Sequence, residues 1–255
     1  MPNPVIYAVA DLHGWLPDVP SDAELVILAG DICPDFSPRG ARYQGHYVDP
    51  SGIQQKEWLN TTFRVWLERT REEWLREERD HPVKFIGVWG NHDFVGEKPF
   101  LIPEGLRWTL LQDQEFEFRY MPVGGSEQTD VKGLRVWGTP WVPGLPYWAF
   151  FADDVKLSEK VALIPEGIDI LISHGPPKGV LDRVGLRSTG SEALLDLTKT
   201  PRAPQVVICG HIHEGRGLAG SGYADVYNVA ARNGLYELHK APFVRIRING
   251  KGYDD

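Results

Sequence analysis

The chain has 255 residues, of which 42% are hydrophobic and 24% are charged, and its formal net charge at pH 7 is −8. These proportions are ordinary for a globular protein that buries a sizeable core. The negative charge argues against a protein that grips long nucleic acids through a basic face. Because bound metal ions can supply local positive charge, a small phosphorylated substrate remains possible.

The N-terminus, Met-Pro-Asn-Pro, lacks the basic and apolar regions of a signal peptide, and no apolar run reaches the length of a membrane span. We therefore expect a cytoplasmic protein that has no membrane partner. The two cysteines, Cys33 and Cys209, lie in apolar surroundings, which predicts buried free thiols in a reducing compartment. No repeat or linker is visible, so we expect a single domain over residues 1–255.

Short apolar runs typical of buried strands recur along the chain. The clearest of them occupy residues 5–10, 25–29, 83–89, 168–173 and 206–209. Weaker strand patterns are found at residues 109–110, 115–120, 134–138, 227–230, 235–238 and 243–248. Each of the five clear runs ends in polar residues that can bind metal ions, and a glycine accompanies most of these endings.

The first two runs end in Asp11-Leu12-His13 and in Gly30-Asp31. Residues i and i+2 of an extended backbone project to the same side, so Asp11 and His13 can converge. Open α/β sheets bind ligands at the carboxyl ends of their strands. Taken alone, each unit is equally compatible with a residue that caps a turn or lies on the surface.

Residues 36–52 are irregular and contain Arg39, Arg42 and His46. The connection is long enough for a lid or a substrate loop, and equally for a solvated insertion without a role. Residues 53–79 read as a long helix. Its apolar face holds Leu59, Phe63, Trp66, Leu67, Thr70 and Trp74, which we expect to anchor the core.

The third run leads into Gly90-Asn91-His92-Asp93. An asparagine carbonyl oxygen can bind a metal ion, and the adjacent histidine can act as an acid or a base. Further on, residues 137–151 are rich in proline and aromatic side chains. This segment either lines a pocket that stacks a flat group or closes one edge of the core.

The last two runs end in His174 and in Gly210-His211-Ile212-His213. With the earlier endings, they supply a set of nitrogen and oxygen ligands without thiolates. Such a set favours Mn, Fe, Zn or Ni over a structural zinc site built on cysteine. It also exceeds the needs of one ion, so two ions that share a carboxylate are the natural solution.

The five blocks, from Asp11 to His213, resemble the pattern of the calcineurin-like metallophosphoesterases: Asp-x-His, Gly-Asp, Gly-Asn-His, His and Gly-His-x-His. Residues 137–141, 173–177 and 210–215 look most like the metallophosphoesterase-domain-containing branch, which is related to the class III cyclic nucleotide phosphodiesterases. The resemblance implies an α/β fold, an αββα sandwich of two mixed sheets flanked by helices.

The resemblance also implies roles for individual residues. One metal ion would be held by Asp11, His13, Asp31 and His213. The second would be held by Asp31 as a bridge together with Asn91, His174 and His211. His92 matches the family's catalytic histidine, which touches the phosphate or the leaving group. Asp35 and Asp93 either orient His92 or are ordinary turn residues.

The function implied is hydrolysis of a small phosphodiester by a hydroxide that bridges two divalent ions, with Mn the first expectation and Fe, Zn or Ni as alternatives. A 2′,3′- or 3′,5′-cyclic nucleotide is the expected substrate, with Trp15, His46 and Trp141 as candidate substrate residues. An exonuclease or a phosphomonoesterase on the same metal site is the enzymatic alternative. A nucleotide-binding sensor is the alternative outside enzymes, and the aromatic loop is compatible with a homo-oligomer.

Overall fold

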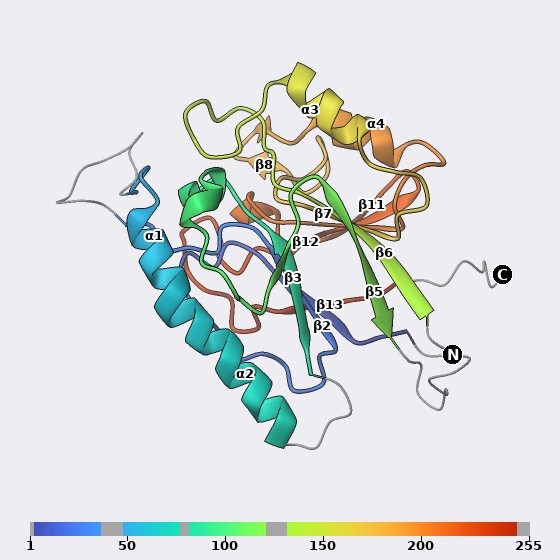
Figure 1. The fold of residues 1–255 in the computed structure, drawn as a ribbon. Helices are drawn as coiled ribbons and strands as arrows, with labels where there is room; N and C mark the ends of the chain where they lie inside the picture. Colours follow the sequence, from blue (N-terminus) through green and yellow to red (C-terminus); the bar gives the residue numbers. More distant parts are fainter. Residues whose placement is uncertain (1–2, 37–47, 77–81, 121–131, 249–255) are drawn as a thin grey trace.

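Two mixed β-sheets lie face to face at the centre of the molecule (Figure 1). The computed structural model describes residues 3–36, 48–76, 82–120 and 132–248. The first sheet has the strand order β13-β1-β2-β3-β4, in which β1 to β4 are parallel and β13 is antiparallel to β1. Its strands are β1 (Ile6–Val9), β2 (Leu25–Ala29), β3 (Lys84–Val88), β4 (Thr109–Leu110) and β13 (Val244–Ile246).

The second sheet has the order β11-β12-β10-β7-β6-β5, with a parallel centre and an antiparallel strand at each edge. Its strands are β5 (Gln114–Tyr120), β6 (Lys132–Thr139), β7 (Ile170–Ser173), β10 (Val206–Cys209), β11 (Gly217–Ser221) and β12 (Ala224–Asn228). A separate small hairpin pairs β8 (Arg183–Val184) with β9 (Arg187–Ser188).

The apolar runs are continuous because both faces of each central strand are buried. In β2, Leu25, Ile27 and Ala29 enter the core between the two sheets, whereas Val26 and Leu28 face the core beneath the long helix. The same alternation in β10 divides its residues between the inter-sheet core and the core under the opposite helices. Strand periodicity thus explains how one run serves two cores.

Helices cover the outer faces of both sheets (Figure 1). The first sheet is covered by α1 (Ile53–Trp58), the π-helical turn η2 (Leu59–Phe63) and α2 (Arg64–Arg76). The second sheet is covered by α3 (Asp154–Ala162) and α4 (Glu192–Thr198). Short 3₁₀ turns are η3 (Phe94–Glu97), η4 (Pro99–Leu101) and η5 (His213–Gly215). The expected αββα sandwich of two mixed sheets is confirmed.

The long helix differs from its prediction in one respect, because a π-helical turn interrupts it at Leu59–Phe63. The wider turn brings Trp58 and Phe63, five residues apart, into a stacked contact with ring centroids 5.6 Å apart. Trp58, Trp66 and Trp74 are buried, as expected for core anchors. Residues 77–79 of the predicted helix, and residues 37–47 of the predicted loop, lie outside the described residues.

Helices α3 and α4 were not expected from periodicity, because each is short and Leu157 is the one buried residue of α3. Their N-caps are nevertheless visible in the sequence: Asp153 accepts a hydrogen bond from the Lys156 N–H, and Ser191 accepts one from the Leu194 N–H. Cys33 and Cys209 are buried and unpaired, as predicted. Among the described residues, no helix has the length and apolar character to cross a bilayer.

Candidate metal centre

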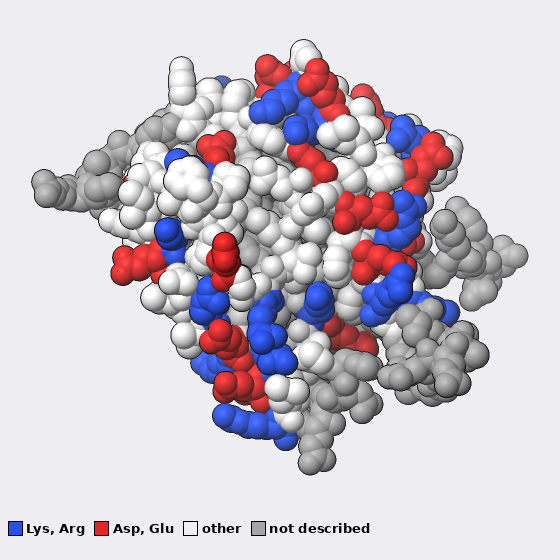
Figure 2. Space-filling view, in the orientation of Figure 1, with Lys and Arg blue, Asp and Glu red and all other residues white. Residues whose placement is uncertain are grey.

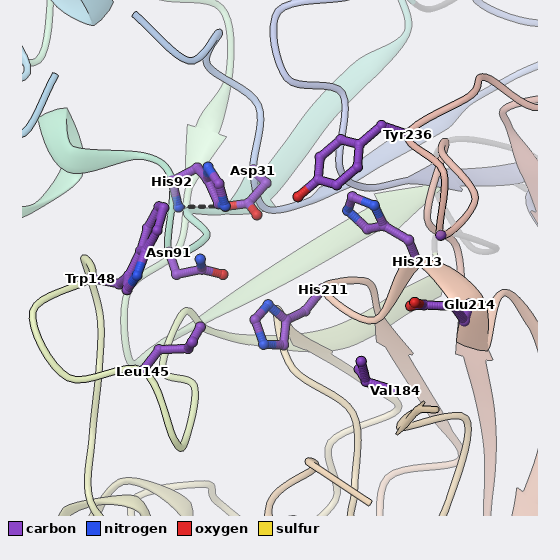
Figure 3. A pocket seen from close by; sticks show the side chains of 11 residues that line it. Asp31, Asn91, His92, Leu145, Trp148, Val184, His211, His213, Glu214 and Tyr236 are labelled. Atoms are coloured by element: carbon purple, nitrogen blue, oxygen red, sulfur yellow. Dashed lines mark hydrogen bonds between the residues drawn. The ribbon is translucent and has the colours of Figure 1, made fainter. Parts of the chain in front are cut away.

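Polar side chains from both sheets meet where their parallel strands end (Figure 3). Asp11 and His13 follow β1, Asp31 follows β2, and Asn91 and His92 follow β3 of the first sheet. The second sheet contributes three histidines after β7 and β10, which are His174, His211 and His213. Three groups have ligand atoms within 4.8 Å of one another: Asp11, His13 and His213; Asp31, His174 and His211; and His13, Asp35 and His92, so that the first and the third share His13.

The first group is organised around the fully buried carboxylate of Asp11. Its Oδ1 lies 3.4 Å from Nε2 of His213, and the His211 N–H donates to both carboxylate oxygens at 3.0 Å. Burial raises the pKa of Asp11, but the hydrogen bond and the charge of His213 outweigh it, so the pKa lies below its usual value. Asp11 is therefore ionised, as a metal ligand must be.

The second group is organised around Asp31, whose Oδ2 lies 3.2 Å from Nε2 of His174 and 4.0 Å from Nε2 of His13. The other oxygen, Oδ1, accepts a hydrogen bond of 2.7 Å from the His92 N–H (Figure 3). A single carboxylate oxygen thus faces histidines of both groups. Oδ1 of Asn91 lies 3.1 Å from the same His174 nitrogen.

The histidines direct ring nitrogens to places where a metal ion could bind. Nδ1 of His174 lies 2.8 Å from the Ala29 carbonyl oxygen, to which it donates, and this contact orients Nε2 toward Asp31 and Asn91. Burial and the nearby charge of His174 lower the pKa of His211 to about 3, so its ring is neutral. Both ring nitrogens of His13 are buried and make no hydrogen bond to any described residue.

These observations fit a pair of divalent ions. A buried imidazole without a hydrogen-bond partner is costly unless a ligand completes it, and His13 is in that position. The ionised carboxylates of Asp11 and Asp31 attract cations: the charge of Asp31 outweighs the burial of His174 and raises the pKa of His174 to about 9, so a metal ion bound there would replace the Nε2 proton. The nitrogen and oxygen donor set suits transition metals of the Mn to Zn series.

The backbone at the ligands is strained. Asp11, His13, Asp31 and His211 have φ angles of 56°, 44°, 52° and 66°, in the left-handed region that residues with a side chain rarely adopt. Hydrogen bonds between strand ends hold them there: the Asp11 N–H donates to the Gly30 carbonyl at 3.0 Å, and the His13 N–H to the Asp31 carbonyl at 2.9 Å. The backbone thus fixes the positions of these candidate ligand residues.

Two glycines in the motifs allow the strands to approach each other. A Cβ at Gly90 would lie 2.2 Å from Oδ1 of Asp31 and 2.7 Å from Cε1 of His174. A Cβ at Gly30, where φ is +95°, would lie 2.3 Å from Nδ1 of His174. The Gly-ligand pattern seen in the sequence therefore reflects space that the ligands of neighbouring strands occupy.

Asp35 and Asp93 have different roles. Oδ1 of Asp35 lies 2.8 Å from Nδ1 of His92, so Asp35 orients that ring. Burial lowers the pKa of His92, but the charge of Asp31 and the contact with Asp35 outweigh it and raise the pKa. The Asp93 carboxylate instead accepts hydrogen bonds from the backbone N–H groups of Ile32, Cys33 and Gly90. It joins the loops that follow β2 and β3.

A pocket of about 320 Å³ opens beside these ligands (Figure 3). Its described lining combines ligand residues with Leu145, Trp148, Val184, Glu214, Gly234 and Tyr236. Trp15 and Trp141, which were predicted as substrate residues, do not belong to this lining. Trp15 packs against the core under the long helix, and His46 lies outside the described residues.

Trp141 is held in another environment, which explains its absence from the pocket. Its indole N–H donates to both carboxylate oxygens of Asp113, at 3.1 and 2.9 Å. The ammonium groups of Lys156 and Lys160 lie 3.8 and 4.8 Å from the centre of its ring. One tryptophan of the same aromatic segment, Trp148, does reach the pocket, where its ring centroid lies 4.4 Å from that of His92.

Tyr236 lines the pocket although no sequence motif pointed to it, and it lies in a turn where a strand over residues 235–238 was predicted. Its ring lies 4.8 Å from that of His213 and 5.8 Å from that of His13. Burial, together with the charges of Asp31, Asp35 and Asp11, raises the pKa of Tyr236 to about 12. The preceding Asn233-Gly234 pair is a turn signal, but it does not reveal where the turn lies in space.

The sequence matches the family described as calcineurin-like phosphoesterase over residues 5–215. The chain therefore belongs to the calcineurin-like phosphoesterase family. The matched region contains all seven expected metal ligands and His92, and Tyr236 lies beyond it. The single-domain extent of 1–255 stays a prediction.

The chain is also similar to curated proteins of the expected branch. It is 38% identical over 122 residues to metallophosphoesterase domain-containing protein 1 of Homo sapiens, which covers 47% of this chain and 37% of that protein. It is 36% identical over 115 residues to UPF0046 protein T07D4.2 of Caenorhabditis elegans, covering 44% of this chain and 29% of the relative. The likeness to the metallophosphoesterase-domain-containing branch is confirmed, and the match spans well under half of each relative.

A solved structure resembles the fold with a TM-score of 0.51 and 15% identity, covering 89% of this chain and 90% of that one. This likeness concerns the arrangement of helices and strands alone.

Proposed function

We propose that this protein is a metal-dependent phosphodiesterase that hydrolyses small phosphodiesters, with 2′,3′- and 3′,5′-cyclic nucleotides as the substrates to test first. The observation that carries the proposal is the convergence of seven ligand residues from five strand ends beside the hydrogen-bonded pair of His92 and Asp35. Membership of the calcineurin-like phosphoesterase family supports it.

The residues divide between two ions. Asp11, His13 and His213 would hold one ion, and Asn91, His174 and His211 the other. The position of Asp31 Oδ2 between His13 and His174 supports its role as the shared ligand. When bound, two divalent ions would supply a water of lowered pKa and positive charge against the phosphoryl oxygens. Mn, Fe, Zn and Ni all accept these ligands. We take Mn²⁺ as the first ion to test.

His92 supplies the proton chemistry in this proposal. The contact between Asp35 and Nδ1 orients the ring, which lines the pocket and is buried. With Nδ1 occupied by Asp35, the Nε2–H can donate to a phosphoryl oxygen or to the leaving alkoxide. A positioned acid of this kind contributes roughly 10²–10⁴-fold to the rate.

The walls of the pocket support a diester over a monoester. The apolar and aromatic walls formed by Leu145, Trp148 and Val184 suit the organic groups that a diester carries on both sides.

The charge of the visible surface supports a small substrate. In Figure 2, positive and negative side chains alternate along α2 and near α3 and α4, and the described residues of this face form no basic stripe. A long nucleic acid needs such a stripe for its phosphates. Together with the net charge of −8, this argues against the exonuclease alternative.

The test is hydrolysis by protein that has been stripped of metal and reloaded with Mn²⁺. The substrates are bis-p-nitrophenyl phosphate, p-nitrophenyl phosphate, 2′,3′-cAMP, 3′,5′-cAMP and a single-stranded oligonucleotide. Preference for the diester and for a cyclic nucleotide is expected. Preference for the monoester or the oligonucleotide would move the function to a phosphatase or a nuclease. Tight nucleotide binding without turnover would favour the sensor.

A further inference from the structure

Tyr236 is a substrate-binding residue of this site, as we infer from its place in the pocket: its hydroxyl donates a hydrogen bond to a phosphoryl oxygen of the bound phosphoester. The inference rests on the proposed function and extends it to the segment after residue 215, which the family match does not cover. Its basis is the position of the ring, the backbone that holds it, and a hydroxyl that makes no hydrogen bond to a described residue.

The ring of Tyr236 lies beside the candidate metal ligands. It lines the pocket together with Asp31, His92 and His213, and makes edge contact with His213 at 4.8 Å between centroids. In Figure 3, its hydroxyl points into the site toward Asp31, from the side opposite Trp148. A phosphoryl group bound to metal ions at these residues would therefore lie within reach of this hydroxyl.

The backbone of Tyr236 is held in a strained conformation by the hydrogen bonds of its turn. Its φ angle is 62°, in the left-handed region that residues with a large side chain rarely adopt. The turn is held by hydrogen bonds from the Tyr236 N–H to the Asn233 carbonyl at 2.8 Å and from Arg232 to the Tyr236 carbonyl at 2.9 Å. The side-chain oxygen of Asn233 also accepts from the N–H groups of Leu235 and Glu237. Strain that is maintained in this way at a pocket points to a function.

The pocket offers few hydrogen-bond donors to an anion. Within its described lining, Asp31 and Glu214 are acceptors, and His211, His213 and Asn91 would direct their lone pairs to metal ions. The side-chain donors of the lining are His92 and Tyr236, which lie on different sides of the site (Figure 3), together with the amide NH2 of Asn91 and the indole N–H of Trp148. The Tyr236 hydroxyl makes no hydrogen bond to a described residue, and a phenol is protonated at neutral pH. It is thus available to the substrate.

The experiment compares Mn²⁺-loaded wild type with Tyr236→Phe, which keeps the ring against His213 and removes only the hydroxyl. Tyr223→Phe is the matched control, because Tyr223 is exposed on the turn between β11 and β12. Bound Mn²⁺ is measured by elemental analysis, and the Kd of inorganic phosphate by calorimetry. A hydrogen bond to a charged group corresponds to roughly a tenfold or larger rise in Kd when it is lost. Kinetics with bis-p-nitrophenyl phosphate should show a similar loss of kcat/KM.

The inference is supported if Tyr236→Phe weakens phosphate binding about tenfold, with unchanged Mn²⁺ content and with Tyr223→Phe equal to wild type. It is overturned if the Kd of Tyr236→Phe stays within about twofold of wild type, or if Mn²⁺ is lost, which would mean that Tyr236 acts through the ligands. Weakened phosphate binding in a protein that hydrolyses none of the esters would support the inference and reject the proposed function. Equal hydrolysis by wild type and Tyr236→Phe would support the proposed function and reject the inference.

Discussion

At the scale of single residues, the site requires a glycine at position 90 as well as the candidate ligand side chains. Gly90 separates β3 from Asn91 and His92, and the space beside its Cα is filled by Asp31 and His174 from two other strands. The φ angle of Gly90 is not in the left-handed region, so an alanine could adopt the backbone there. The reason for glycine at this position is space alone.

Gly90→Ala should therefore damage the metal centre more than the fold. The added Cβ would lie 2.2 Å from Oδ1 of Asp31, so the carboxylate must move away from its neighbours. We expect reduced Mn²⁺ content and a turnover lower by about 100-fold, because displacements of about 1 Å in a catalytic site have effects of that size. Elemental analysis and hydrolysis of bis-p-nitrophenyl phosphate measure the two quantities.

Gly220→Ala is the control, because Gly220 lies in β11 with no atom within 4 Å of an added Cβ. It should keep the metal content and activity of wild type. Normal metal binding by Gly90→Ala would contradict the explanation.

His92 allows the proton role to be separated from metal binding. Its ring contacts Asp35, and only its backbone N–H contacts the carboxylate of Asp31. His92→Ala keeps that N–H, so it should retain two ions per chain while kcat falls by roughly 10²–10⁴-fold. Metal content and steady-state kinetics check this prediction. Loss of metal together with activity would show that His92 is a ligand and not a proton donor.

At the scale of elements, the β8–β9 hairpin forms one wall of the pocket through Val184. It is fastened by the buried carboxylate of Asp182, which accepts hydrogen bonds from the N–H groups of Gly179 and Gly190 and from the Ser188 hydroxyl, at 2.9, 2.8 and 2.6 Å. Burial raises the pKa of Asp182, but these hydrogen bonds outweigh it and hold the pKa below its usual value. Asp182 therefore stabilises the folded state as a carboxylate.

Asp182→Ala should lower the free energy of unfolding at pH 7 by about 2–3 kcal/mol, because it leaves buried N–H groups without an acceptor. Since the folded pKa lies below the unfolded value of about 3.9, this contribution is complete above that pH and is lost as the pH falls through the folded pKa. Urea unfolding at pH 7, 5 and 3.5 measures the difference from wild type, which should shrink at the lowest pH. Ser188→Ala, which removes one donor, should cost about 1 kcal/mol. A difference that does not change with pH would argue against the carboxylate.

At the scale of the whole molecule, the candidate metal centre lies between the two sheets. Asp11, His13, Asp31 and Asn91 come from the first sheet, and the remaining ligands, His174, His211 and His213, come from the second. Metal ions that bind here would link sheets whose other contact is the apolar core between them. Binding should therefore stabilise the fold and not only the site.

Addition of Mn²⁺ at about 100 times its Kd should stabilise the protein by about 2.7 kcal/mol per site, which for a chain of this size raises the Tm by roughly 5–10 °C. Thermal unfolding in EDTA and in Mn²⁺ measures the shift. His174→Ala, which removes a ligand of the second sheet, should show a smaller shift. Equal Tm values for wild type in EDTA and in Mn²⁺ would contradict a link between the sheets.

The sequence by itself determined the five clear strands, the candidate ligand types and the pairing of each candidate ligand with a strand end, but it missed β8, β9 and β11 and predicted a strand at residues 235–238, which form a turn. These features are local: an apolar run, a glycine and a polar residue follow one another within a few positions, as in Gly30-Asp31 and Gly90-Asn91. The family resemblance supplied the αββα arrangement, which the structure confirms. The contact of Asp35 with His92 was foreseen as one of two possibilities.

Only the tertiary structure decided which aromatic residues surround the site. Trp141 and Trp148 lie in the same segment, yet Asp113 and two lysines hold the first away from the pocket, while the second lies against His92. Tyr236 reaches the ligands from a turn 23 residues after His213, and its strained backbone is set by that turn. Composition and periodicity report burial and local conformation, whereas the walls of a pocket depend on how distant loops meet in space.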